Sequence, residues 1–212
     1  MFLIDFDDTI FDTQRFKEAR LQVVQAVGVS SDLYWQSYRE ARAPVEGIVT
    51  YSNERHADLL ARHGFSREMI LFALAQTTNE TVHQFLFPDT IPFLTFLRQY
   101  NQPMALLSLS DPAFQEKKVK GTRISTFFDN IFIVDETKAL VVKEVIQHYH
   151  YHDIWLFNDR VEESQEFKEQ FPMLKIVLKQ SPAIPVGQYI QSGLPYFSTL
   201  TEIQHYVKDQ LG

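Results

Sequence analysis

The sequence predicts an α/β fold, a doubly wound parallel sheet that carries an inserted all-helical cap domain. Past Pro88, short apolar runs of strand type alternate with helical segments, which is typical of a parallel sheet covered by helices on both faces. The chain also opens on an apolar run, residues 1–4, which we expect in the same sheet. Between these parts, residues 12–87 show almost no strand pattern. We therefore predict a core of residues 1–11 and 88–212 and a cap of residues 12–87.

Four helical segments are expected in the inserted block, each opened by a side chain that can cap a helix. The first follows Asp12 or Thr13 and ends at Gly28. The other three should begin at 30–32, at 52–53 and at Ser66, the last with a break near 78–79. Helical spacing places an apolar stripe on one face of the first helix, formed by Phe16, Ala19, Val23 and Val27.

The second part of the chain alternates helices and strands. Asp111-Pro112 marks a helix start, because a capping residue precedes a proline in the first turn. The segment 199–202 reads Thr-Leu-Thr-Glu, a capping box that opens the last helix. Strands are expected at 104–107, 131–134, 154–157 and 174–178, and the other helices at 91–100, 139–149 and 161–171.

The composition argues against several classes of protein. With 212 residues, 45% of them apolar, the chain can bury an ample core. It has no cysteine, which excludes disulfides and thiolate chemistry and leads us to expect a cytoplasmic protein. We expect neither a membrane span nor a signal peptide. A net charge of −7 without a basic cluster argues against a nucleic-acid polymer as partner. The oligomeric state is left open.

Acidic and hydroxyl side chains gather where the predicted strands end. Asp5, Asp7 and Thr9 follow the first strand, Ser108 ends another, and Asp159 follows a third. Doubly wound sheets bind ligands at this edge. Strand alternation points Asp5 and Asp7 the same way, roughly 6–7 Å apart. Two like charges so close are costly unless a cation lies between them, so the sequence predicts a Mg²⁺ site.

Four motifs, in this order, resemble those of the haloacid dehalogenase-like (HAD) hydrolase superfamily, in subclass I, which inserts a helical cap after the first strand. Asp-x-Asp-x-Thr matches 5–9, and an apolar strand that ends in Ser or Thr matches 105–108. A lysine just before a helix matches Lys138, and an acidic pair after a strand matches Asp159 with Glu163 or, alternatively, Glu162. The resemblance covers essentially the whole chain and implies a Rossmann-like core. Dehalogenases of the superfamily lack the second Asp, so the resemblance implies a phosphatase.

The resemblance also implies roles for these residues. Asp5 would attack phosphorus and form an aspartyl-phosphate, and Asp7 would protonate the leaving oxygen and then activate water. Asp5, Asp159 and the backbone carbonyl of Asp7 would hold Mg²⁺. Lys138 would balance charge and be oriented by Glu163. The residues expected at the phosphate are Asp8, Thr9 (as a positioning hydroxyl), Ser108, Leu109 (through its backbone amide) and Lys138.

The resulting hypothesis is a Mg²⁺-dependent phosphatase for a small phosphorylated metabolite. A phosphomutase of the same fold and a non-catalytic binding protein remain alternatives. The histidine-rich stretch 148–152 should lie at the far edge of the sheet, so we expect solvated or packed histidines there rather than a metal site. A second charge on the substrate could meet cap cations, among which the sequence does not choose: Arg15, Lys17, Arg39, Arg42 and Arg55.

Overall fold

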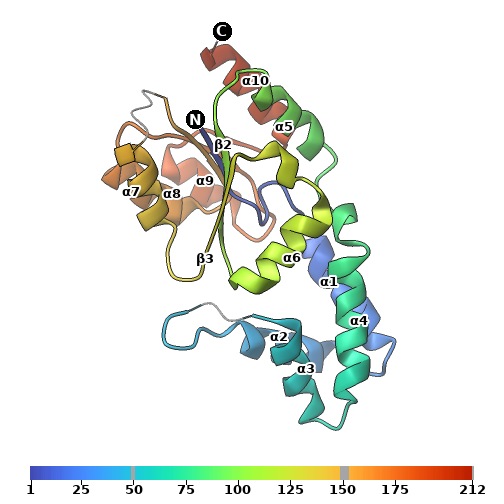
Figure 1. Cartoon of the computed structure of the whole chain (residues 1–212). Coiled ribbons are helices and arrows are strands. Elements are labelled where there is room, and N and C mark those ends of the chain that lie inside the picture. The colour runs from blue at the N-terminus through green and yellow to red at the C-terminus, as the bar shows by residue number, and fades with distance from the viewer. Residues whose placement is uncertain (49–50, 149–152, 212) are drawn as a thin grey trace.

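The predicted fold class is confirmed by a six-stranded parallel sheet flanked by helices (Figure 1). The computed structural model describes residues 1–48, 51–148 and 153–211. The strand order is β3-β2-β1-β4-β5-β6, and each strand pairs with its neighbour in parallel. The strands are β1 (Phe2–Ile4), β2 (Met104–Leu109), β3 (Asn130–Val134), β4 (Trp155–Asn158), β5 (Lys175–Lys179) and β6 (Tyr196–Phe197).

The sheet is buried on both faces because helices cover it from both sides. Along β1, Phe2 and Ile4 belong to one apolar core, whereas Leu3 belongs to the other. The first core includes side chains of α5 (Thr90–Arg98), α6 (Pro112–Thr122) and α10 (Leu200–Leu211). The second includes side chains of α7 (Ala139–His148), α8 (Val161–Gln170) and α9 (Val186–Ser192). A strand with both faces covered must be apolar throughout, which explains the uninterrupted apolar run at residues 1–4.

The inserted block forms a separate group of helices at one end of the sheet (Figure 1). Its helices have their own apolar cluster, which includes Val24, Tyr34, Leu60 and Ile70. The predicted helix starts are confirmed, since Asp12, Ser30, Ser52 and Ser66 each accept a backbone N–H of the first turn. The elements are α1 (Thr13–Gln25), α2 (Ser31–Arg42), α3 (Asn53–Ala61), α4 (Arg67–Asn79) and the 3₁₀ helix η1 (Val82–Phe85).

The two passages between core and insertion run side by side. The backbone N–H of Asp12 donates to Phe85 O at 2.7 Å, and that of Phe87 donates to Ile10 O at 3.3 Å. A block whose two connections lie together can be inserted without disturbing the sheet around it. We therefore propose that the cap comprises residues 12–87, as the sequence suggests.

Three features differ from, or lie beyond, the sequence-based expectation. The buried side chains of α1 are Phe16, Arg20 and Val24, a face shifted from the predicted stripe. Helix α9 and strand β6 were not predicted, because both are short and the segment around them is rich in proline and glycine. His148 ends α7, and the other residues of the histidine-rich stretch lie outside the described residues. No helix within the described ranges is long and apolar enough to cross a membrane.

Candidate active site

A cavity of about 610 Å³ opens at the carboxyl ends of the central strands. The core lines it with Asp5 after β1, Ser108 and Leu109 in β2, and Asp159 after β4. Helices α1 and α2 of the inserted block line it from the other side. The cavity has the size of a small-molecule site and lies where doubly wound sheets bind ligands.

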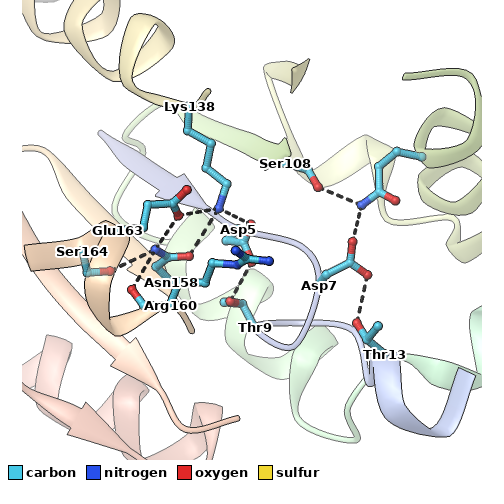
Figure 2. Close-up of polar contacts among 11 residues, drawn as sticks. Asp5, Asp7, Thr9, Thr13, Ser108, Lys138, Asn158, Arg160, Glu163 and Ser164 are labelled. Carbon is cyan, nitrogen blue, oxygen red and sulfur yellow. Dashed lines mark hydrogen bonds and ion pairs between the residues drawn. The ribbon is translucent and has the colours of Figure 1, made fainter. Parts of the chain in front are cut away.

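Lys138 lies between two carboxylates at the cavity. Its Nζ is 2.8 Å from Asp5 Oδ1 and 2.9 Å from Glu163 Oε2 (Figure 2). Burial alone would lower the pKa of Lys138, but the two carboxylates outweigh burial and raise it above the ordinary value. Thr9 Oγ1 donates to Asp5 Oδ2 at 3.0 Å. The carboxylate of Asp5 is therefore fixed at both oxygens beside a permanent positive charge.

Asn158 connects the lysine to α8. Its Nδ2 donates to Glu163 Oε2 and to Ser164 Oγ, both at 2.9 Å. Its Oδ1 accepts from Lys138 Nζ at 3.4 Å. Glu163 is thus the acid that contacts Lys138, whereas Glu162 is exposed in the first turn of α8. Of the two acids that the sequence left open, the geometry favours Glu163.

The carboxylate of Asp7 contacts side chains of α6 and of the start of α1. Its Oδ1 accepts from Thr13 Oγ1 at 2.9 Å and from Lys118 Nζ at 2.6 Å, and its Oδ2 accepts from Gln115 Nε2 at 2.7 Å. Figure 2 shows Ser108, Asp7 and Thr13 along one line of polar contacts. Each of the two carboxylates has its own lysine, Lys138 for Asp5 and Lys118 for Asp7.

The ion pair also sets the charge state of Asp7. Burial alone would raise the pKa of Asp7, but the charge of Lys118 and hydrogen bonds from Lys118, Gln115 and Thr13 outweigh burial and hold the pKa below its ordinary value. Burial lowers the pKa of Lys118, and Asp7 opposes that shift. Asp7 is therefore ionised in this geometry.

Lys118 and Gln115 were missed by the sequence reasoning. The Lys118 side chain is 4% exposed, and its Nζ lies 4.6–5.9 Å from the ring centroids of four phenylalanines, Phe6, Phe11, Phe16 and Phe114. Gln115 donates to both Asp7 and Ser108 Oγ, the latter at 2.8 Å. A signal existed, since the two residues are three apart on the helix that starts directly after the Ser108 strand.

Of the remaining residues that were predicted to bind the phosphate, Leu109 and Asp8 line the cavity and Thr9 does not. Asp8 has φ of 59°, and its side chain accepts from the backbone N–H of Thr13 at 3.2 Å. Thr9 is fully buried, is not among the residues that line the cavity, and donates its hydroxyl to Asp5.

Asp159 provides a second carboxylate, beside Asp5, that suits a bound cation. Its side chain is buried at the cavity, and burial together with the carboxylates of Asp5 and Asp8 raises its pKa well above the ordinary value. Among the described residues its carboxylate receives no hydrogen bond. No group of three or more His, Asp or Glu side chains in the described chain is arranged to enclose a metal ion. Mg²⁺ needs only one or two carboxylates beside water and phosphate, so Asp5 and Asp159 fit it.

Comparisons with known proteins give matches at the level of structure. No protein-family model and no curated protein matches the sequence. A Burkholderia xenovorans LB400 protein assigned to the haloacid dehalogenase-like hydrolases matches all of this chain and 97% of its own, with a TM-score of 0.76 and 17% identity. YfnB of Bacillus subtilis, assigned to the same group and solved with magnesium, covers 98% and 97% of the two chains, with a TM-score of 0.62 and 16% identity.

An L-2-haloacid dehalogenase from Xanthobacter autotrophicus is also similar. It matches 98% of this chain and 97% of its own, with a TM-score of 0.64 and 16% identity. Identities this low indicate a common fold only. The reaction and the substrate must be argued from the residues of the site. The sheet order, the inserted helices and these matches agree over the full length, and the chain has the fold of the haloacid dehalogenase-like hydrolases.

Proposed function

We propose that this chain is a Mg²⁺-dependent phosphatase that hydrolyses a small phosphorylated metabolite through an aspartyl-phosphate on Asp5. The observation that carries the proposal is the pair of carboxylates at one cavity, each held by its own lysine. Asp5 is fixed by Lys138 and Thr9, and Asp7 by Lys118, Gln115 and Thr13. A nucleophile and a separate acid–base group are what hydrolysis through a covalent intermediate needs.

In the first half of the reaction, an Asp5 oxygen would form a bond to phosphorus while the bond to the leaving oxygen breaks. Asp7 would give the leaving oxygen a proton. Because Asp7 is ionised in the resting geometry, it must first gain a proton, which a singly protonated phosphate ester can bring with it. The Ser108 hydroxyl keeps its own O–H free to donate to a phosphate oxygen, since it accepts from Gln115.

In the second half, water would attack phosphorus, the bond to Asp5 would break, and Asp7 would accept the proton from water. Lys138 would balance the charge on the phosphoryl group beside Asp5. Mg²⁺, when bound by Asp5, Asp159 and the backbone carbonyl of Asp7, would supply neutralisation of phosphate charge. We propose that the enzyme acts in the cytoplasm, and that neither a nucleic acid polymer nor a membrane is its partner.

Dehalogenation is the competing reaction, because one similar structure is an L-2-haloacid dehalogenase. A halide leaves without a proton, so a dehalogenase has no use for a second carboxylate at the nucleophile. In this chain Asp7 lines the cavity and receives three hydrogen bonds, which favours phosphoryl transfer.

The direct test is hydrolysis of p-nitrophenyl phosphate by the wild type, Asp5→Asn and the control Asp58→Asn, each with Mg²⁺ and with EDTA. Asp58 is an exposed carboxylate of α3 that does not line the cavity. We expect metal-dependent turnover in the wild type and the control, and a loss of at least about a thousandfold in Asp5→Asn. Turnover that survives in Asp5→Asn would show that the proposal is wrong.

Two further assays separate the alternatives. Release of halide from 2-chloropropionate would assign the chain to the dehalogenases, and a phosphorylated isomer as product would assign it to the mutases. If no substrate reacts, binding of beryllium fluoride with Mg²⁺ tests whether Asp5 can still accept a phosphoryl group. Absence of that binding would favour a non-catalytic binding protein.

A further inference from the structure

The two sides of the cavity wall differ in charge. The core contributes carboxylates, which include Asp5, Asp7, Asp8 and Asp159, together with the cations Lys118, Lys138 and Arg160. The described residues of the inserted block contribute three cations to the wall and no carboxylate, although residues 12–87 contain nine acidic and eight basic side chains in all. The cations are Lys17, Arg20 and Arg42. A nearly balanced segment thus turns only positive charge toward the cavity.

Two of these cations are available for a ligand. Within the described parts of the chain, neither Lys17 nor Arg42 has a carboxylate within ion-pair distance. Burial lowers the pKa of Lys17, the carboxylates of Asp8 and Asp7 oppose that shift from a distance, and the positive charges of Arg42 and Arg160 add to it. Lys17 and Arg42 repel each other and neither is paired directly with a carboxylate, so an anion between them would relieve that repulsion.

Arg42 and Arg20 are held by aromatic and hydroxyl groups rather than by acids. The Arg42 guanidinium lies 5.8 Å from the centroid of the Tyr38 ring. Arg20 is buried at 1% exposure, donates to Tyr51, Asn53 and Thr78, and keeps an unpaired Nε. Among the described residues, neither guanidinium is paired directly with a carboxylate at the cap side of the cavity. Guanidinium groups match planar and tetrahedral oxyanions well.

The phosphoryl group itself already has partners in the core. Lys138, Ser108 and the Leu109 segment lie at the strand ends beside Asp5. A cavity of about 610 Å³ holds more than one phosphate group, and its cap side carries Lys17 and Arg42. We propose that the substrate carries a second anionic group, a carboxylate or a phosphate, that binds between Lys17 and Arg42. This inference rests on the proposed function, because it takes the reacting phosphate to be bound at Asp5.

The test compares analogues that cannot be hydrolysed. Binding to the wild type with Mg²⁺ is measured by calorimetry for 3-phosphonopropionate, 4-phosphonobutyrate and propane-1,3-bisphosphonate, and for propylphosphonate and butylphosphonate as partners without the second anion. We expect at least one doubly anionic analogue to bind tenfold or more tightly than its partner. The carboxylate and bisphosphonate arms show which second anion the site takes.

Variants then assign the preference to the cap cations. In Lys17→Gln and Arg42→Gln, the affinity of the doubly anionic analogue divided by that of its partner without the second anion should fall toward one. In Arg39→Gln it should stay as in the wild type, because Arg39 is an exposed residue of the same helix as Arg42 and does not line the cavity. The proposal is overturned if doubly anionic analogues have no advantage at any length, or if the variants weaken butylphosphonate as much as 4-phosphonobutyrate.

The p-nitrophenyl phosphate assay separates this failure from that of the proposed function. Mg²⁺-dependent turnover without any preference for a second anion refutes the cap site alone. No turnover, together with no binding of either analogue series, refutes both.

Discussion

Lys118 Nζ lies 2.6 Å from Asp7 Oδ1, and this contact joins α6 to the loop that follows β1. The lysine is surrounded by phenylalanine rings and the carboxylate reaches the cavity, so the pair bridges the apolar core and the candidate site. Three donors fix Asp7, two of them from α6 of the core and one from Thr13 at the start of α1. The position of the proposed acid–base group is thus set mainly by the core.

Replacing Lys118 by Met should shift the pH dependence of the reaction. In the wild type the pKa of Asp7 is held low, so its ionised form persists below the usual carboxyl range. Without the ammonium, burial raises that pKa, and the acid limb of kcat should move to higher pH. Removing one partner of a buried pair costs about 3–5 kcal/mol, and we expect about 2 kcal/mol because the Asp7 side chain is 31% exposed. Rate profiles with p-nitrophenyl phosphate and urea unfolding measure both effects.

The control for this variant is Lys120→Met on the same helix. Lys120 is exposed and pairs with Glu116 one turn away, an interaction worth about 0.3–0.5 kcal/mol. Its pH profile should match that of the wild type. An unchanged acid limb in Lys118→Met would mean that the ion pair does not govern the charge of Asp7.

Glu163→Gln should reduce turnover by removing one of the two negative charges beside Lys138. The amide of glutamine can still accept a hydrogen bond, but it carries no charge that raises the pKa of Lys138. Its single oxygen must also serve both Lys138 and Asn158, which both contact Glu163 Oε2 in the wild type. We expect kcat/KM to fall about tenfold, which corresponds to about 1.4 kcal/mol. Glu162→Gln, one residue away and exposed, should stay within about twofold. The reverse order of the two effects would assign the role to Glu162.

Local signals explain what could be predicted from the sequence. Helix caps at Ser30 and Ser66 depend on neighbouring residues alone, and both form as expected. The gathering of Asp5, Ser108 and Asp159 at one cavity follows from the rule that parallel strands end at a common edge.

The contacts that could not be predicted are those between distant segments. Lys118 lies 111 residues from Asp7 along the chain, and the surrounding sequence, with Glu116 and Lys117, reads as a solvated helix. Only the packing of α6 against the loop after β1 makes the lysine a partner of Asp7. Arg20 is a similar case, because its burial depends on acceptors from α3 and α4.

His56 should make the protein less stable in mild acid. Burial and the nearby Arg20 lower its pKa from 6.5 to about 3, so the folded state keeps the ring neutral while the unfolded state takes up a proton below pH 6.5. Stability from this group is present above pH 6.5 and declines as the pH falls toward 3. Between pH 7 and pH 5 the loss should be about 2 kcal/mol. Urea unfolding at the two pH values measures it.

The matched variant is His56→Gln, whose amide can replace part of the hydrogen bonding to Ser37 and Tyr51. It should be less stable than the wild type at pH 7, yet lose about 2 kcal/mol less between pH 7 and pH 5. Equal losses in both proteins would show that other groups cause the acid sensitivity.

Gly121→Ala should destabilise the contact between α6 and η1, even though alanine favours a helix by about 1 kcal/mol. A Cβ at this position would lie 2.3 Å from Val82 Cγ1 and 3.2 Å from Thr78 O. Val82 is fully buried, so relief requires the inserted block to shift against the helix that carries Lys118. Overpacking costs about 1–3 kcal/mol, and we expect a net loss of about 1 kcal/mol in the free energy of unfolding. In Gly187→Ala of α9, the added Cβ meets no atom of the described residues within 4 Å, so this variant should be neutral or stabilising, and a similar loss there would remove the steric explanation.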